Sequence, residues 1–408
     1  MTDQILTASG HNSRAFTVYP ERYGLIDAWR GLAALAVVVH HCGGPAIGAA
    51  AVMVFFVISG YCIAGAADSC QRKNLGFTAF MWRRFRRIYP PYALALLFWT
   101  LTRLIKLKQS GVNDLARPWT QWVQNITLTQ WLSLLRNPLP EAPQNPSLFV
   151  AAFWSLCYEE QFYLVFALMI LLCGLIGLSV RAMVMLLLPL ALLWNTAFPQ
   201  LCYGLFIEYW AMFAVGSLVF YALCRARSRS DRMLLVGAII AITALSAFLN
   251  FFAGIAWKIS PDPENPFRIA WHELLIASGF ALLLIAMRPL DERFKKFRPL
   301  SLPLHGLGMI TYSLYLIHQF NLALVATVAS KCLAIIRWPD PPAWVFLTVQ
   351  CAGHIALASV FWYFCERPFL NRSLLPSDRA GRPKDHAHGV SGHASGPIPA
   401  PAAPAAGS

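Results

Sequence analysis

Long apolar runs separated by short polar loops dominate the pattern of this chain. Each run is close to the length of about 20 residues that one α-helix needs to cross a bilayer. Backbone polar groups in lipid must be bonded within their own segment, and the period-two alternation of a membrane β-barrel is absent. The pattern therefore predicts an all-α fold, a polytopic membrane helical bundle of about ten transmembrane helices. The runs lie at roughly 25–42, 47–66, 89–105, 148–174, 180–195, 204–224, 232–253, 268–287, 308–330 and 343–365.

The polar segments at the two ends divide the chain into three parts. We expect a cytoplasmic N-terminal segment at 1–24, a transmembrane domain at 25–370 and a cytoplasmic tail at 371–408. The tail is rich in Pro, Ala, Gly and His, a composition that favours disorder.

Two of the polar segments are predicted to hold helices of their own. The tryptophans of the longest loop, 106–147, predict an interfacial helix, and its prolines predict an irregular segment after it. The basic stretch 76–88 predicts a helix that lies on the cytoplasmic surface of the membrane. We expect this helix to end at Pro90 and Pro91, because proline lacks the backbone N–H that would continue it.

Charge gives the chain an orientation. The sequence is 57% hydrophobic and 13% charged, with a net charge of +14. If the N-terminus is inside, 24 of the 33 Lys and Arg residues fall on the inside and nine fall on the outside. This asymmetry predicts that both termini are cytoplasmic. Because the basic residues follow the loops of a membrane protein, they do not indicate binding to nucleic acid.

The cysteines and histidines do not form a recognisable metal site. Neither a CxxC pair nor an HExxH motif occurs among the ten Cys and ten His residues. Most of the cysteines lie inside apolar runs, and we interpret them as small apolar fillers. Glycine-rich phosphate loops and a Ser-His-Asp triad are not recognisable either. We therefore expect no bound metal.

Arg30 and His41 stand out in the first run, because charged groups inside membrane helices are costly and often functional. Eleven residues make about three helical turns, or about 16 Å, so both side chains face nearly the same side. The pair would suit a long donor with a phosphate head, because guanidinium binds phosphate and neutral imidazole can act as a general base. The alternative is that Arg30 reaches lipid headgroups and His41 bonds a neighbouring helix. His40 points about 100° away.

Six short motifs follow one another along the predicted transmembrane domain. They are Asp27 to His41 with its Arg30-Gly31-Leu32-Ala33 core, Phe55–Gly60 (FFVISG), Arg83–Pro90 (RRFRRIYP), Trp154–Tyr163 (WSLCYEEQFY), Thr311–His318 (TYSLYLIH) and Glu366–Phe369 (ERPF). Each motif alone is weak. In this order, and over nearly the whole domain, they resemble the acyltransferase-3 family of multi-pass membrane O-acyltransferases.

The resemblance implies ten transmembrane helices in the bacterial inner membrane, acetyl-CoA or a similar acyl-CoA as co-substrate, and a sugar hydroxyl as acceptor. It also implies that His41 is the catalytic base and that Arg30 supports it. Cys157 and Tyr158 stand where small or branched residues are common in the family, so packing there is expected to differ. Because no soluble domain is appended, all the chemistry is expected within the membrane domain.

Glu159 and Glu160 lie near the middle of the fourth run, where an unpaired carboxylate is costly. One of them could orient His41 or bind the sugar, and we count both as catalytic candidates. Structural pairing with an arginine is the alternative. Adjacent positions on a helix point about 100° apart, so the two are not expected to share one role.

Arg83, Arg84 and Arg87 form a partly one-sided basic patch, because positions three or four apart share a helical face. We predict that they bind the phosphates of the acyl-CoA, and the alternative is orientation by anionic lipid. We also place Ser59 at the donor site. Close packing of Ser59 and Gly60 against the first helix is the simpler interpretation.

Trp154, Tyr315 and His318 are the candidates for contact with the acceptor. Tyr315 and His318 share a helical face, although His318 could equally be a histidine bonded within the bundle. Glu366 and Arg367 end the last run, and we predict a mainly structural role for them.

The sequence thus predicts a membrane enzyme that moves an acyl group, in the first place acetyl, from cytoplasmic acyl-CoA to a hydroxyl of an extracytoplasmic carbohydrate or glycolipid. Its expected partners are these two substrates and the membrane lipids. The alternative is a proton-coupled transporter of a small solute or lipid, in which the buried Arg, His and Glu residues form a proton relay.

Overall fold

The computed structural model describes residues 18–19, 23–136, 148–198, 201–202, 204–251, 271–335 and 341–370. Every regular element within these ranges is helical, which confirms the predicted all-α class. The tail 371–408, most of segment 1–24 and the proline-rich end of loop 106–147 lie outside the described residues.

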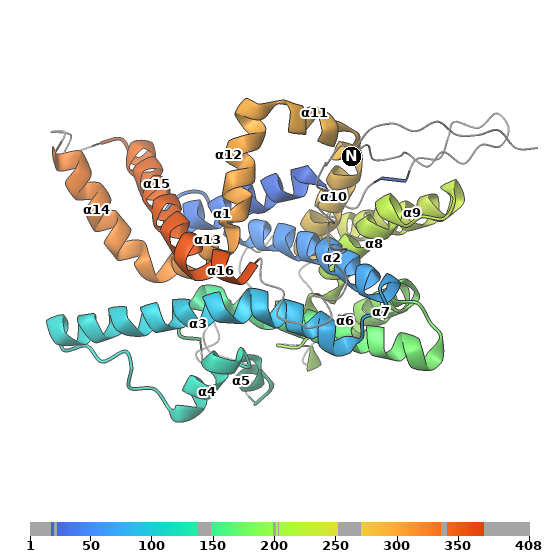
Figure 1. Ribbon diagram of the computed structural model, residues 1–408, viewed down its shortest axis with the longest axis horizontal. Helices are drawn as coiled ribbons and strands as arrows, with labels where there is room; N and C mark the ends of the chain where they lie inside the picture. The colour runs from blue at the N-terminus through green and yellow to red at the C-terminus, as the bar shows by residue number, and fades with distance from the viewer. Residues whose placement is uncertain are drawn as a thin grey trace, which may run out of the picture. The chain divides into compact units, whose positions relative to one another are not determined.

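The α-helices (Figure 1) are α1 (Gly24–His41), α2 (Gly48–Arg72), α3 (Phe77–Ser110), α4 (Trp119–Thr127), α5 (Trp131–Arg136), α6 (Trp154–Ile176), α7 (Val180–Ala197), α8 (Trp210–Cys224), α9 (Arg229–Phe251), α10 (Trp271–Met287), α11 (Asp291–Lys296), α12 (Arg298–Met309), α13 (Thr311–Ile317), α14 (Leu322–Ile335), α15 (Ala343–Phe361) and α16 (Arg367–Leu370). Short turns of 3-10 helix are η1 (Ala151–Phe153), η3 (Phe206–Glu208), η4 (Arg288–Leu290) and η5 (Gln319–Asn321), and η6 (Trp362–Glu366) is a π-helix.

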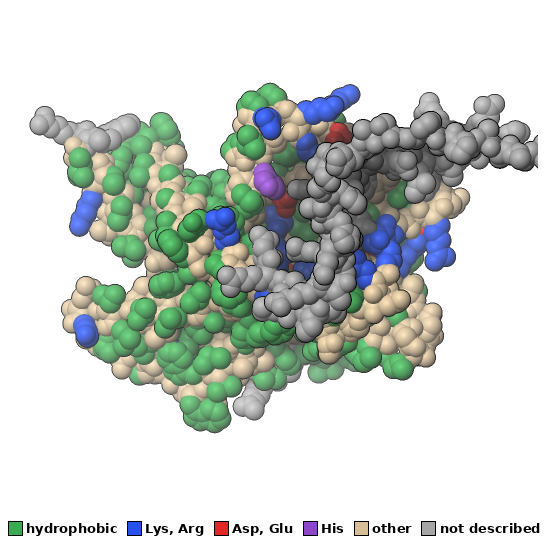
Figure 2. Space-filling view, viewed as in Figure 1, with side chains coloured by type: hydrophobic (Ala, Val, Ile, Leu, Met, Phe, Trp, Pro, Cys, Tyr) green, Lys and Arg blue, Asp and Glu red, His purple; other side chains and the backbone are tan. Residues whose placement is uncertain are grey.

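Seven helical segments of the described chain are long and apolar enough to cross a membrane, and the bent pair α12 and α13 would make an eighth. The seven comprise α2, α3, α6, α7, α9, α10 and α15, three of them with short helical extensions. Hydrophobic side chains cover much of the visible surface of α3, α14 and α15 (Figure 2). The chain is therefore an integral membrane protein. All ten predicted runs fall on helical segments. However, α1 is not among the seven spans, α8 is shorter than a full crossing and run 308–330 is divided among several helices, so the count of ten stays a prediction.

Helix α3 overturns the prediction that a basic surface helix ends at Pro90 and Pro91. It runs without a break from Phe77 to Ser110, with both prolines inside it. The prolines remove two backbone donors from this turn, a loss that membrane helices tolerate where neighbouring groups compensate. The hydroxyl of Tyr312 donates to the carbonyl oxygen of Ile88 at 2.9 Å in the same turn. Helix α13 therefore contacts α3 at this turn, although the carbonyl groups that the prolines leave without a helical donor are those of Arg86 and Arg87.

The predicted run 308–330 is not one helix. Helices α12 and α13 meet at a bend of 50°, and the turn η5 separates α13 from α14. The side chain of Asn321 donates to the carbonyl oxygen of Ile317 at 2.9 Å and so bonds a group at the end of α13. This break places His318 at the C-terminal cap of α13, not inside a long helix.

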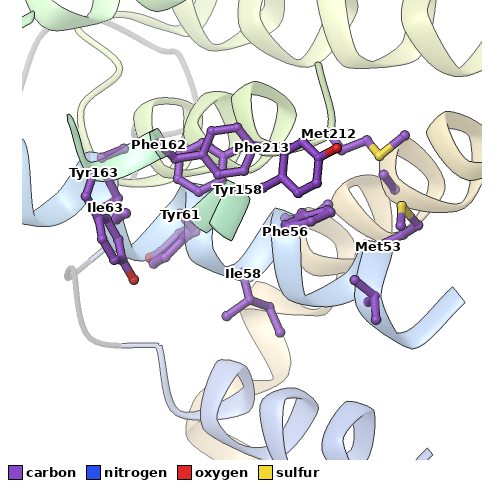
Figure 3. Close-up of a cluster of buried hydrophobic side chains, with 14 of the residues drawn as sticks. Met53, Phe56, Ile58, Tyr61, Ile63, Tyr158, Phe162, Tyr163, Met212 and Phe213 are labelled. Carbon is purple, nitrogen blue, oxygen red and sulfur yellow. The ribbon is translucent and has the colours of Figure 1, made fainter. Parts of the chain in front are cut away.

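The core forms where α2 crosses α6 and α8. Figure 3 shows Met53, Phe56 and Tyr61 of α2 among aromatic side chains of α6 and α8. A Cβ atom added to Gly60 would lie 1.9 Å from the carbonyl oxygen of Phe213, so the α2 and α8 backbones touch. The prediction that Gly60 packs against the first helix is thus wrong, because Gly60 contacts the backbone of α8 instead. Every residue of α8 is buried, as expected for a helix that is apolar all round.

Candidate active site

A pocket of about 820 Å³ opens between α1, α2, α3, α6 and α13. Its walls combine three arginines, one carboxylate, several hydroxyls and a thiol with apolar side chains. The lining residues are Arg30, Phe55, Phe56, Ile58, Ser59, Cys62, Ile63, Arg84, Arg87, Ile88, Ser155, Leu156, Glu159, Tyr163, Thr311, Tyr312 and Tyr315. The second to fifth of the six sequence motifs contribute most of the lining residues, and the first motif contributes Arg30.

The basic side of the pocket is made by Arg30 of α1 with Arg84 and Arg87 of α3. The guanidinium of Arg84 lies over the ring of Tyr163, 5.6 Å from its centroid. Arg84 and Arg87 are three positions apart and so share a helical face. Arg83, which we grouped with them from the sequence, is not among the lining residues.

The acidic side of the pocket is Glu159. Its carboxylate accepts a hydrogen bond from the hydroxyl of Ser59 at 2.9 Å and another from the hydroxyl of Tyr163. Ser59 and Glu159, predicted for different roles, are therefore direct partners that line the same pocket.

Glu160 points elsewhere, as the 100° step between adjacent helical positions requires. It lines an adjoining pocket of about 400 Å³ that is mostly apolar and also includes Glu159. Phe85 and Tyr89, whose rings stack with centroids 4.7 Å apart, belong to this second pocket too. Of the two adjacent carboxylates, Glu159 is thus the one that faces the basic pocket.

Glu366 is a residue whose link to the pocket we did not predict. Only 3% exposed, it accepts hydrogen bonds from the backbone N–H of Ser313, at 3.1 Å, and from the hydroxyl of the same residue. The charges of Arg87 and Arg30 act on its carboxylate. The π-helix η6 carries Glu366, and such irregular turns are frequent at functional sites. The ERPF motif marked the position, but only the fold shows that Glu366 is buried and bonded to Ser313, near the pocket arginines.

His41 lies at the end of α1, the unbroken helix that also carries Arg30. It is not among the residues that line the basic pocket. Its ring centroid is 5.1 Å from that of His318, and the ring of His318 is 5.8 Å from that of Tyr315. Tyr315 lines the pocket, and its hydroxyl bonds Ser155 at 2.6 Å and the carbonyl oxygen of Ala152. The pocket and His41 are therefore joined through Tyr315 and His318.

Trp154 does not line the pocket. Its ring packs against those of Phe56, Tyr158 and Tyr209, with centroids 5.6 to 6.1 Å apart. Tyr158 in turn donates a hydrogen bond to Glu208. Of the three candidates for acceptor contact, Tyr315 alone lines the pocket, with His318 behind it and Trp154 in an aromatic cluster beside it.

Comparison with known proteins decides which family this architecture represents. The model of an acyltransferase domain, that of the acyltransferase-3 family, matches residues 23–361. The chain belongs to the acyltransferase-3 family. The match covers every lining residue of the basic pocket and His41, so these groups lie within the acyl-transferring domain of a membrane enzyme.

Two relatives are consistent with the family. A protein of Komagataeibacter xylinus, provisionally named as the membrane-bound transacylase BcsY, is 28% identical over 302 residues, which are 72% of this chain and 71% of the relative. "Protein 2 in picA locus" of Rhizobium radiobacter is 40% identical over 85 residues, 19% of this chain and 44% of the relative. No solved structure matches the chain.

Proposed function

We propose that this acyltransferase moves an acyl group, in the first place acetyl, from cytoplasmic acyl-CoA to a hydroxyl of an extracytoplasmic carbohydrate or glycolipid. We place it in the bacterial inner membrane with about ten crossings and both termini in the cytoplasm. The observation that carries the proposal is the arrangement of Arg30, Arg84 and Arg87 around one pocket, with His41 at the far end of the helix that holds Arg30.

The three arginines fit the phosphate groups of CoA. Guanidinium groups bind phosphate through charge-assisted hydrogen bonds, which are stronger where water is largely excluded. All three are half-buried. Arg30 forms an ion pair with Asp27 at 3.9 Å, whereas Glu159 and Glu366 are bonded by hydroxyl or backbone donors. The guanidinium groups are therefore positioned to receive an anionic ligand.

His41 is suited to take the proton from the acceptor. It lies about three turns, or about 16 Å, from Arg30 along α1. Tyr315 and His318 lie between the pocket and His41, so the proposal requires the acyl end of the donor to pass these side chains. As the acceptor hydroxyl gives its proton to His41, its oxygen bonds the thioester carbonyl carbon. The carbon–sulfur bond then breaks, and the CoA thiolate leaves and takes the proton from His41. Holding donor and acceptor together supplies much of the rate.

The experiment compares His41→Ala with His40→Ala in cells whose own copy of the gene is deleted. Mass spectrometry of the surface carbohydrates of wild-type and deleted cells identifies the acyl group and the modified sugar. We expect His41→Ala to abolish the modification, because a general base contributes about 10²- to 10⁴-fold in rate. His40→Ala removes the adjacent imidazole and should keep the modification.

Two outcomes would contradict the proposal. Unchanged acylation in the His41→Ala cells would remove His41 as the base. Identical carbohydrate masses in wild-type and deleted cells, together with uptake or export of a solute that needs no acyl-CoA supply, would favour the transporter instead.

A further inference from the structure

The imidazole rings of His41 and His318 pack together beside Tyr315 of the basic pocket, and a third histidine, His354, lies on the neighbouring helix α15. His41 ends α1, His318 caps α13 and His354 lies within α15. His318 and His354 are both fully buried, at 0% exposure, whereas His41 is half-buried. Buried polar atoms in proteins are almost always hydrogen-bonded, yet Nε2 of His318 and both ring nitrogens of His354 have no hydrogen-bond partner among the described residues.

The bonds of His318 fix which of its nitrogens carries hydrogen. Nδ1 lies 2.8 Å from the carbonyl oxygen of Tyr315 and 3.2 Å from that of Leu314. A carbonyl oxygen can only accept, so Nδ1 must donate. In a neutral imidazole the other nitrogen, Nε2, then presents a lone pair. No protein group among the described residues bonds Nε2, although it is buried.

His41 is the side chain whose imidazole ring packs against that of His318. The two ring centroids are 5.1 Å apart, with the planes inclined at 40°. At that separation a turn of the His41 ring brings one of its nitrogens within a hydrogen bond, about 2.9 Å, of Nε2. His41 is only half-buried, so part of its side chain remains accessible.

We propose that His318 is the positioning residue of His41: its Nε2 accepts a hydrogen bond from one ring N–H of His41 and so leaves the other nitrogen free as the base. The proposal rests on the proposed function, because it assumes that His41 takes the acceptor's proton. The hydrogen on His41 stays there throughout, and His318 remains neutral. When His41 becomes positively charged, its bond to Nε2 becomes charge-assisted and stronger.

The backbone explains why His318 can hold this position. Its ring is bonded to the carbonyl oxygen of Tyr315, whose side chain lines the basic pocket. Tyr315 is itself fixed by Ser155 and by the carbonyl oxygen of Ala152. The same short segment thus forms the inner wall of the pocket and orients the imidazole behind it, as partners of catalytic and metal-bound histidines commonly do.

The test compares His318→Gln with His318→Met in purified protein, supplied with acetyl-CoA and the acceptor found by the carbohydrate analysis. The two side chains have similar length, but Gln keeps an acceptor oxygen near the position of Nε2 and Met does not. We expect His318→Met to lower kcat by about tenfold or more while KM for acetyl-CoA stays the same. His318→Gln should recover most of that loss. His354→Leu, a change at an equally buried histidine on the neighbouring helix α15, should keep kcat within about threefold of the wild type.

Equal loss in His318→Gln and His318→Met would overturn the proposal, as would a loss in His354→Leu as large as that in His318→Met. A change in KM for acetyl-CoA with kcat unchanged would do the same. Size-exclusion profiles and melting temperatures identify any variant that fails to fold, and the Gln to Met comparison is then repeated with Asn and Leu. Failure of the proposed function is seen separately, as an active His41→Ala enzyme or as a wild type that transfers no acyl group.

Discussion

At the scale of single residues, the structure distinguishes between arginines of α3 that the sequence pattern grouped together. Arg84 and Arg87 line the pocket and Arg83 does not. We expect Arg84→Ala to raise KM for acyl-CoA by about 10- to 100-fold, the loss of one hydrogen bond to a charged group. Steady-state kinetics in detergent or nanodiscs would measure it. Arg83→Ala is the matched control from the same helix, and an equal rise in KM there would indicate a general effect of surface charge.

Glu366 gives a second residue-scale prediction. The buried carboxylate of Glu366 accepts hydrogen bonds from the backbone N–H and the hydroxyl of Ser313. Glu366→Ala should therefore cost about 1–3 kcal/mol of stability, because a buried donor loses its partner. Glu366→Gln keeps an acceptor and should cost less. The melting temperatures of the two purified variants are compared by measuring the loss of the monodisperse chromatographic peak on heating. Equal melting temperatures would show that the hydrogen bond contributes little.

At the scale of helices, the glycines of α2 and α9 make contrasting predictions. A Cβ on Gly60 would meet the backbone of α8 at 1.9 Å, whereas a Cβ on Gly237 would meet nothing within 4 Å. Gly60→Ala must push two core helices apart and should cost about 1–3 kcal/mol. Gly237→Ala should be neutral or mildly stabilising, because alanine favours the helix. Heated-sample chromatography of both variants tests this, and a Gly60→Ala protein as stable as the wild type would contradict the close contact.

The helices also show what the sequence could predict. Apolar runs and helical spacing were enough for α1 and for the helical class of all ten runs, whereas the common face of Arg30 and His41 stays a prediction. The predicted end at Pro90 and Pro91 was wrong because a helix packed among other helices tolerates proline, and contacts between distant segments such as Tyr312 and Ile88 leave no local signal. The partner of Glu159 was missed for the same reason, since Ser59 lies 100 positions away.

The sequence also could not predict the order in which the groups of the site lie between Arg30 and His41. The spacing of Arg30 and His41 suggested one shared passage. In the structure Tyr315 and His318 stand between the pocket and His41, because the run 308–330 breaks into α13, η5 and α14. A break of this kind depends on capping by Asn321 and on packing, and the apolar pattern continues unchanged across it.

At the scale of the whole molecule, the mechanism needs the pocket arginines to face the cytoplasm, where acyl-CoA is made. Arg84 and Arg87 lie near the start of α3, and the loop that contains α4 and α5 follows its end. The positive-inside rule then places the start of α3 inside and residues 111–118 outside. Alkaline phosphatase fused after Asn113 should be active in cells, whereas the same enzyme fused after Leu370 should be inactive and green fluorescent protein fused there should fluoresce. The reverse result would put the arginines on the side without acyl-CoA, and the anion at this pocket would then have to be a ligand from outside the cell.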